Sequence, residues 1–273
     1  MSFNTALPES FLYGAAAGSI GFYTTLWLTQ VATLKFPDLE KRVLALKDKP
    51  RYYFWALGPS TLHALVQCLG TAAFLPKMRN DPIIGMDQRL WVEYGLTGLG
   101  PSFFSGIFVG YLLADFIFLG PSKLGTAYVF HHLSASVCWT MAQTIGSFQF
   151  VAQLLQFCEF STIFMNLRQL YLTAGYDSST PQVVWASLVF FASFGLVRVA
   201  PLPQVLYRWI NQDFTIIRNE IGMGAALLFS AFFTVHAVLQ TMWFGIMIQR
   251  LIAKSGGAGS SKKKKQEGES KED

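Results

Sequence analysis

Charge is scarce in this 273-residue chain, because only 14% of its residues are Asp, Glu, Lys or Arg, whereas 52% are hydrophobic. An ordinary soluble domain is about one-quarter charged. Many of the charged residues lie in one early segment, residues 35–51, and in the C-terminal tail. This shortage excludes an ordinary soluble domain. It predicts an all-α, polytopic membrane protein.

Cysteine and histidine are also rare, with three and four residues respectively. No Cys-x-x-Cys pair occurs, which argues against a disulfide framework, a zinc ribbon or a redox pair. The histidines are too few for a membrane di-iron oxygenase, and they lack the second pair that a two-haem bundle would need, so neither a metal site nor a cofactor is expected. No lysine lies in the middle of a span to form a retinal Schiff base, and the P-loop, GxGxxG and GxSxG motifs are missing.

Apolar runs long enough to cross a bilayer recur along the chain. We expect seven spans, at about residues 11–34, 52–75, 102–119, 125–145, 150–172, 183–200 and 221–252. The positive-inside rule places the basic segment 35–51 in the cytosol, and seven spans then place the C-terminus there as well. We therefore expect residues 1–50 to hold an N-terminal transmembrane helix and a cytosolic basic loop, and residues 255–273, rich in Gly, Ser and Lys, to form a disordered cytosolic tail.

The net charge of +5 could suggest nucleic acid as a partner. The basic residues do not form one folded patch with interleaved aromatic residues, however, and they stand where topology signals stand. No nucleic-acid partner is therefore expected. Within the first span Gly14, Gly18 and Gly21 repeat at a small-residue spacing, which favours close helix packing.

Ionisable residues inside apolar runs mark the segment from Tyr111 to Arg168, and such residues are costly in a membrane. Asp115 lies about five residues before a break at residues 120–123, and His131 lies about six residues after Gly125, so a rise of 1.5 Å per residue puts both at similar depth. His132 shares a helix face with Tyr128, Ser136, Thr140 and Gln143, whereas His131 is turned about a quarter of a circle away. The spacing predicts that His132 is the better centred histidine.

Two further polar stripes lie on other predicted spans. One span carries Ser60, His63, Gln67 and Thr71 on one face, and another carries Glu159, Thr162, Asn166 and Gln169 within an arc of about 80°. Because bare polar groups facing hydrocarbon cost several kcal/mol each, we expect the stripes to converge on one shared polar cavity.

The residues allow two interpretations of this cluster. Asp115 could orient an imidazole for general acid–base or nucleophilic chemistry, as a carboxylate does in a catalytic triad. The alternative is a buried hydrogen-bonded network that fixes helix packing, and for Glu159 and Arg198 a charge-paired strut is favoured. If the histidine pair is chemical or binds a ligand, replacing His131 or His132 should leave stability nearly unchanged.

Taken together, these residues resemble the TLC-domain family, which includes ceramide synthases, translocon-associated membrane proteins and several lipid-homeostasis proteins. The resemblance covers roughly Arg51 to Lys254, which we interpret as a TLC domain at residues 51–254. It rests on Tyr111 and Asp115, the pair His131–His132, the string from Glu159 to Arg168, Arg198, and the stretch from Gln240 to Phe244.

The resemblance implies a six-helix TLC-type bundle around a central cavity, preceded here by one extra helix. In ceramide synthases the histidine pair and nearby acidic residues carry acyl transfer from acyl-CoA to a sphingoid amine. By position His131, His132 and Asp115 are therefore the catalytic candidates if this chain is an enzyme, with acyl-CoA as a substrate and no cofactor. The candidate lipid-binding residues are His63, Gln67, Tyr111, Ser136, Glu159, Thr162, Asn166 and Arg198.

One stretch departs from ceramide synthases. Where those enzymes have His-Asp followed shortly by another Asp, this chain has Glu159-Phe160-Ser161-Thr162, which resembles the shorter TLC-domain proteins linked to membrane lipid composition. The leading expectation is a membrane protein, in the endoplasmic reticulum, that binds a lipid or acyl chain in lipid homeostasis, with modification of that lipid left open. The alternatives are a ceramide synthase-like N-acyltransferase and a non-enzymatic cargo receptor or interaction protein.

Overall fold

The computed structural model describes residues 7, 9–78, 100–120, 125–145, 149–220 and 222–269, and every regular element in these ranges is a helix. The predicted all-α fold is therefore confirmed. In chain order the elements are α1 (Glu9–Thr33), α2 (Pro37–Ala45), α3 (Asp48–Met78), α5 (Pro101–Leu119), α6 (Thr126–Ile145), α7 (Gln149–Gln156), α8 (Glu159–Thr173), α9 (Pro181–Phe194), the π-helix η2 (Gly195–Val199), α10 (Leu202–Arg208), the π-helix η3 (Trp209–Asp213), α11 (Phe214–Glu220) and α12 (Met223–Glu269).

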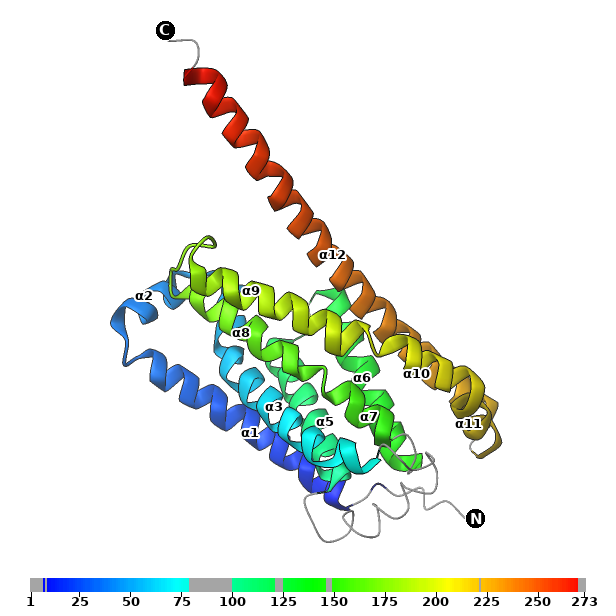
Figure 1. Ribbon diagram of the computed structural model, residues 1–273. Coiled ribbons are helices and arrows are strands. Elements are labelled where there is room, and N and C mark those ends of the chain that lie inside the picture. Colours follow the sequence, from blue (N-terminus) through cyan, green and yellow to red (C-terminus); the bar gives the residue numbers. More distant parts are fainter. Residues whose placement is uncertain are drawn as a thin grey trace.

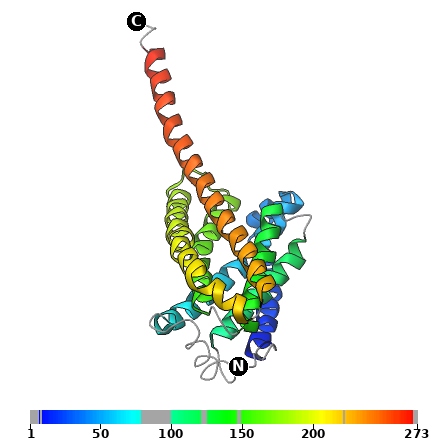
Figure 2. The same cartoon turned by 90° about the vertical axis from the view of Figure 1, so that its right-hand side faces the viewer.

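The helices pack around one another in a closed order. Helix α3 contacts α5, α5 contacts α6, α6 contacts α12, α12 contacts α9, α9 contacts α8, and α8 contacts α3 again. Helix α1 packs outside this ring, against α5 and α3, and α12 extends well beyond the bundle toward the C-terminus (Figures 1 and 2). The arrangement places the ionisable residues of α5, α6 and α8 on the inner side of the bundle.

The distribution of apolar side chains fits a hydrocarbon environment. Among the described residues, three helical stretches are long and apolar enough to cross a membrane: Pro101–Leu119, Pro181–Asn211 and Met223–Ala253. Large apolar side chains face outward, with Trp27 60%, Ile117 71% and Leu196 71% exposed, whereas charged side chains such as Asp115 are buried. A soluble domain seldom exposes so much large apolar surface. The chain is thus an integral membrane protein, and the count of seven spans stays a prediction.

Two elements differ from the continuous spans that hydropathy predicts. The span expected at residues 150–172 is divided into α7 and α8 by a turn at Phe157 and Cys158. The last span continues as helix to Glu269, over most of the stretch predicted to be disordered, because extending an existing helix requires no new nucleation. The domain boundaries near residues 50 and 254 stay predictions.

Helices α1 and α5 approach each other closely at the predicted glycines. A methyl group added at Gly14 would collide with the backbone carbonyl of Phe103, and one added at Gly18 would collide with that of Ile107. No atom among the described residues lies within 4 Å of a methyl group built at Gly21. The close packing is therefore made by Gly14 and Gly18, and Gly21 takes no part in it.

Gly14→Ala is expected to destabilise the bundle by about 1–3 kcal/mol, because overpacking a fitted contact forces the backbones apart. Gly21→Ala is the matched control, since it adds the same methyl group to the same helix in open space. It should leave stability unchanged or raise it by up to about 1 kcal/mol through helix propensity. Thermal unfolding of the purified protein in detergent measures both. Equal melting temperatures for the two variants would contradict the close approach of α1 and α5.

Candidate functional site

Helices α5 and α6 bring Asp115 and His132 together. The His132 Nε2 atom lies 2.9 Å from Asp115 Oδ2, and its Nδ1 atom lies 2.9 Å from the backbone carbonyl oxygen of Tyr128. The expected match in depth between carboxylate and imidazole is therefore confirmed. A carbonyl oxygen only accepts hydrogen bonds, so Nδ1 must carry a proton. The Asp115–His132 contact then holds one further proton, and the pair has no net charge whichever of the two atoms carries it.

His131 faces a different helix from its neighbour. Its ring stacks on His236 of α12, with ring centroids 5.3 Å apart, and meets the Trp243 ring at 5.5 Å. The buried Nδ1 atoms of His131 and His236 have no hydrogen-bond partner among the described residues. His132, by contrast, uses both nitrogens on protein groups. The better-centred histidine is thus fully engaged, and His131 is the member of the pair with a nitrogen available to a ligand.

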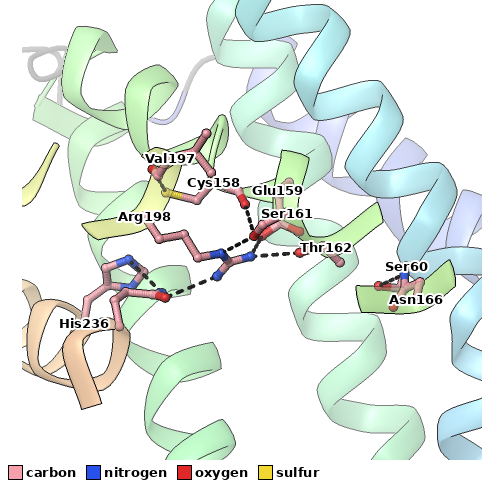
Figure 3. Close-up of polar contacts among 10 residues, drawn as sticks. Ser60, Cys158, Glu159, Ser161, Thr162, Asn166, Val197, Arg198 and His236 are labelled. Carbon is pink, nitrogen blue, oxygen red and sulfur yellow. Dashed lines mark hydrogen bonds and ion pairs between the residues drawn. The ribbon is translucent and has the colours of Figure 1, made fainter. Parts of the chain in front are cut away.

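Arg198 of η2 is the centre of a second polar group, shown in Figure 3. Its Nε atom donates to Ser161 Oγ at 2.7 Å, Nη2 donates to Thr162 Oγ1 at 2.8 Å, and Nη1 donates to Gln240 Oε1 at 3.4 Å. Nη2 also lies 3.6 Å from Glu159 Oε1. The predicted pairing with Glu159 is present, but the shorter contacts are those to the hydroxyl groups. A guanidinium with several fixed donors ties η2 to α8 and α12 at once.

The π-helix that carries Arg198 has a local cause. Pro201 has no N–H to offer the carbonyl of Val197, so the ordinary helical bond to that oxygen cannot form. The Cys158 thiol donates to this carbonyl oxygen instead, at 3.0 Å (Figure 3). The backbone N–H of Ala200, the residue before Pro201, donates to the carbonyl oxygen of Gly195, five residues back, at 2.9 Å. Short π-helical turns of this kind occur often at functional sites.

A third group joins α3 to α5 and α8. The His63 ring stacks on Tyr111, with centroids 3.9 Å apart and planes inclined by 9°. Asn166 Nδ2 donates to Ser60 Oγ at 2.9 Å, and Ser60 also lies near the Tyr111 hydroxyl. One turn further along α3, Gln67 Nε2 donates to a backbone carbonyl of α5. Of the predicted lipid-binding residues, His63 and Tyr111 are therefore in direct contact, and Asn166 contacts Ser60 on the same face of α3.

Two of the predicted polar stripes, those on α3 and α8, meet in a direct contact between Ser60 and Asn166. Ser136 is partly buried one turn after His132, on the predicted face. A small cavity of about 30 Å³ lies between α6, α7 and α12, and its walls are mostly apolar; they include Trp139, Ala142, Leu155, Phe229, Phe233 and His236. The shared polar cavity stays a prediction. No group of three or more His, Cys, Asp or Glu side chains that could hold a metal ion occurs in the described ranges.

Sequence analysis missed His236 as a site residue and singled out Gln240 only within a motif. The two side chains lie one helical turn apart, with Gln240 Nε2 3.4 Å from His236 Nε2. Their i, i+4 spacing, continued by Trp243, puts all three on one face of an otherwise apolar helix. That spacing was available as a signal, but its importance depends on α12 packing against α6.

The TLC-domain family model matches residues 54–249, a range that includes all of the polar groups described above. The chain belongs to the TLC-domain family. The resemblance found in the sequence is thus confirmed, and α1 stands before the matched part of this TLC-domain protein. Its curated relatives include TLC domain-containing protein 4-B of Xenopus laevis, 26% identical over 191 residues, which are 67% of this chain and 68% of the relative.

Other relatives of this TLC-domain protein carry related names. TLC domain-containing protein 4-B of Danio rerio is 29% identical over 190 residues, covering 67% of this chain and 68% of the relative. TLC domain-containing protein 4 of Xenopus tropicalis is 26% identical over 194 residues, covering 67% and 69%. No solved structure gives a significant match.

Proposed function

We propose that this TLC-domain protein binds a lipid or acyl chain within its helix bundle and acts in membrane lipid homeostasis. The observation that carries the proposal is the cavity between α6, α7 and α12, whose apolar walls end at His236. The ring of His236 is stacked on that of His131, and each ring keeps one buried nitrogen without a partner in the described part of the chain. Apolar walls beside hydrogen-bonding imidazoles suit an amphiphile with one apolar chain and one polar end.

The energetics of the imidazoles support a ligand that forms hydrogen bonds. Leaving a buried polar atom without a partner costs about 1–3 kcal/mol, which a polar ligand group at His236 would recover. The cavity of about 30 Å³ has room for one or two water molecules rather than a whole chain. Binding therefore requires the rings of Phe229 and Phe233, which form its α12 wall, to move apart.

Other predicted lipid-binding residues position the polar end of this cavity. Arg198 holds Gln240, which in turn contacts His236, so the group around Glu159 and Thr162 positions the polar end of the cavity. We further propose seven spans with a cytosolic C-terminus and residence in the endoplasmic reticulum. The basic segment 35–51 supports that orientation through the positive-inside rule.

Ala142→Phe should fill the cavity, because Ala142 is 2% exposed and lines its wall. We expect photocrosslinking of a diazirine fatty acid to the purified full-length protein to fall at least about tenfold, equivalent to about 1.4 kcal/mol of binding free energy. Ala192→Phe, at an exposed position of α9, is the control and should crosslink like the unmodified protein. Melting temperatures of both variants separate lost binding from lost folding. Equal crosslinking of a folded Ala142→Phe variant would refute the cavity as the binding site.

Acyl transfer from acyl-CoA to an amine is a second candidate function, and the Asp115–His132 hydrogen bond favours it. Because His132 uses both nitrogens on protein groups, His131 would have to meet the substrate, with His132 and Asp115 positioning residues behind it. Incubation of purified protein with radiolabelled acyl-CoA and a panel of amines tests this candidate. An acylated amine that forms with the unmodified protein and is lost with His131→Ala would support it.

A further inference from the structure

A continuous line of polar side chains, here called the polar seam, runs between α3 and α5. It consists of Ser60, His63, Gln67 and Thr71 on α3 and Ser105 and Tyr111 on α5. The α3 members follow one helix face, and Asp115 stands one turn beyond Tyr111 on α5. The stretch of α5 from Ser105 in the seam to Asp115 is about 15 Å long, at a rise of 1.5 Å per residue.

Glutamine side chains of α7 complete the far end of the polar seam. Gln153 Nε2 and Gln156 Nε2 lie 3.4 and 3.0 Å from Ser105 Oγ. Thr71 Oγ1 donates to the backbone carbonyl of Gln153 at 3.3 Å, and Gln67 Nε2 donates to that of Phe104 at 3.1 Å. The glutamine cluster is therefore in contact with both helices of the seam.

Several buried atoms of the seam lack partners. The Oε1 atoms of Gln67, Gln153 and Gln156, and both ring nitrogens of His63, make no hydrogen bond to any residue that the structure describes. All three glutamines are 0% exposed and His63 is 5% exposed. The amide orientations of Gln67 and Gln153 are fixed, because their nitrogens face backbone carbonyls that only accept. The missing partners must consequently donate to these oxygens.

The near end of the seam reaches the Asp115–His132 pair. His63 is stacked on Tyr111, and Asp115 lies one helical turn beyond Tyr111 on α5. Asp115 and His132 are only 5% and 7% exposed, so the proton held between them has little direct contact with the surroundings of the bundle. The polar side chains of the seam are therefore the route by which this proton could be exchanged with the surroundings.

We propose that ordered water occupies the polar seam from the glutamine cluster to the Asp115–His132 pair and relays protons along it, so that a proton from bulk water replaces the one that the pair gives up. A buried water typically makes two to four hydrogen bonds and can both donate and accept. It can therefore donate to the unpartnered amide oxygens and also pair with the His63 ring in either tautomer. The proton passes along hydrogen bonds: one water releases a proton to its neighbour as it receives another, and no bond to carbon changes. This relay is a function separate from lipid binding at α6, α7 and α12.

Hydrogen exchange at the Asp115–His132 contact tests the relay. Full-length protein labelled with ¹⁵N-histidine is placed in lipid bilayers and transferred to deuterated buffer. Solid-state NMR follows the deuterium isotope shift of the His132 Nε2 resonance, which reports exchange of the proton in the Asp115–His132 contact and is assigned by its loss in His132→Gln. Gln67→Leu replaces a polar side chain of the seam by an apolar one and should slow the exchange at least about tenfold, or about 1.4 kcal/mol in barrier. Gln182→Leu, at an exposed position of α9, is the control and should exchange like the unmodified protein.

Equal exchange in Gln67→Leu and the control would overturn the relay. A second measurement needs no variant, which covers the case in which Gln67→Leu fails to fold. Magnetisation transferred from water to protein should reach the side-chain amides of Gln67 and Gln156 in bilayers of ¹⁵N-glutamine-labelled protein. Amides that stay dry, or that receive magnetisation from a lipid head group instead, would refute a water-filled seam.

Discussion

His132→Ala is expected to lower the free energy of unfolding by about 3 kcal/mol, because it leaves the Asp115 carboxyl group buried without its partner. The substitution also removes the hydrogen bond between the His132 ring and the Tyr128 carbonyl oxygen. His131→Ala is the matched control: it removes the same ring from the next position, but no hydrogen bond to Asp115. Its cost should be about 1 kcal/mol or less, the range of a substitution that leaves no charge unpaired. Unfolding of the purified protein in mixed micelles measures both variants.

A double variant separates the effect of the Asp115–His132 contact from that of packing. Asp115→Leu combined with His132→Leu removes both polar groups, so its cost should be smaller than the sum of the two single changes. If His131→Ala and His132→Ala destabilise equally, the Asp115–His132 contact does not stabilise the bundle as the structure indicates. The structure thus changes the expectation for His132, whose replacement was predicted from the sequence to leave stability nearly unchanged if the histidine pair is chemical or binds a ligand.

Arg198→Met is expected to cost about 3 kcal/mol or more, because it leaves a buried network around Ser161, Thr162 and Gln240 without its donors. Arg168→Met is the matched control, since Arg168 is a partly buried arginine whose Nε donates to Ser187 Oγ. Its loss should cost about 1 kcal/mol, as for a single hydrogen bond. Thermal unfolding in detergent measures both variants. Similar melting temperatures would show that the Arg198 contacts stabilise the protein no more than the single Arg168 contact does.

Glu159→Gln distinguishes a hydrogen-bonded cluster from a simple ion pair around Arg198. The Glu159 carboxylate lies 3.6 Å from the guanidinium, farther than the Ser161 and Thr162 hydroxyl groups. Removing its charge should therefore change stability less than Arg198→Met does. A Glu159→Gln variant as unstable as Arg198→Met would show instead that the charge pair holds η2 against α8.

The positions of most helices follow directly from local patterns in the sequence. The run at residues 102–119 was predicted as a span and corresponds to α5, and the run at 125–145 corresponds to α6. The turn within 150–172 was not predicted. Hydropathy averages over a whole window, so it does not locate the turn at Phe157 and Cys158. The Cys158 thiol there donates to the carbonyl oxygen that Pro201 leaves free.

The candidate site divides in the same way. Helical periodicity alone separated His131 from His132 by a quarter-turn and put Asp115 at their depth, because both properties depend only on rise and rotation per residue. Which helix each histidine meets is a property of the tertiary structure: packing directs His132 to Asp115 on α5 and His131 to His236 on α12. The partners of Arg198 likewise come from two other helices, 36 to 42 residues away in the chain. A sequence pattern records which face of a helix is polar, but only the packing of separate helices determines what that face contacts.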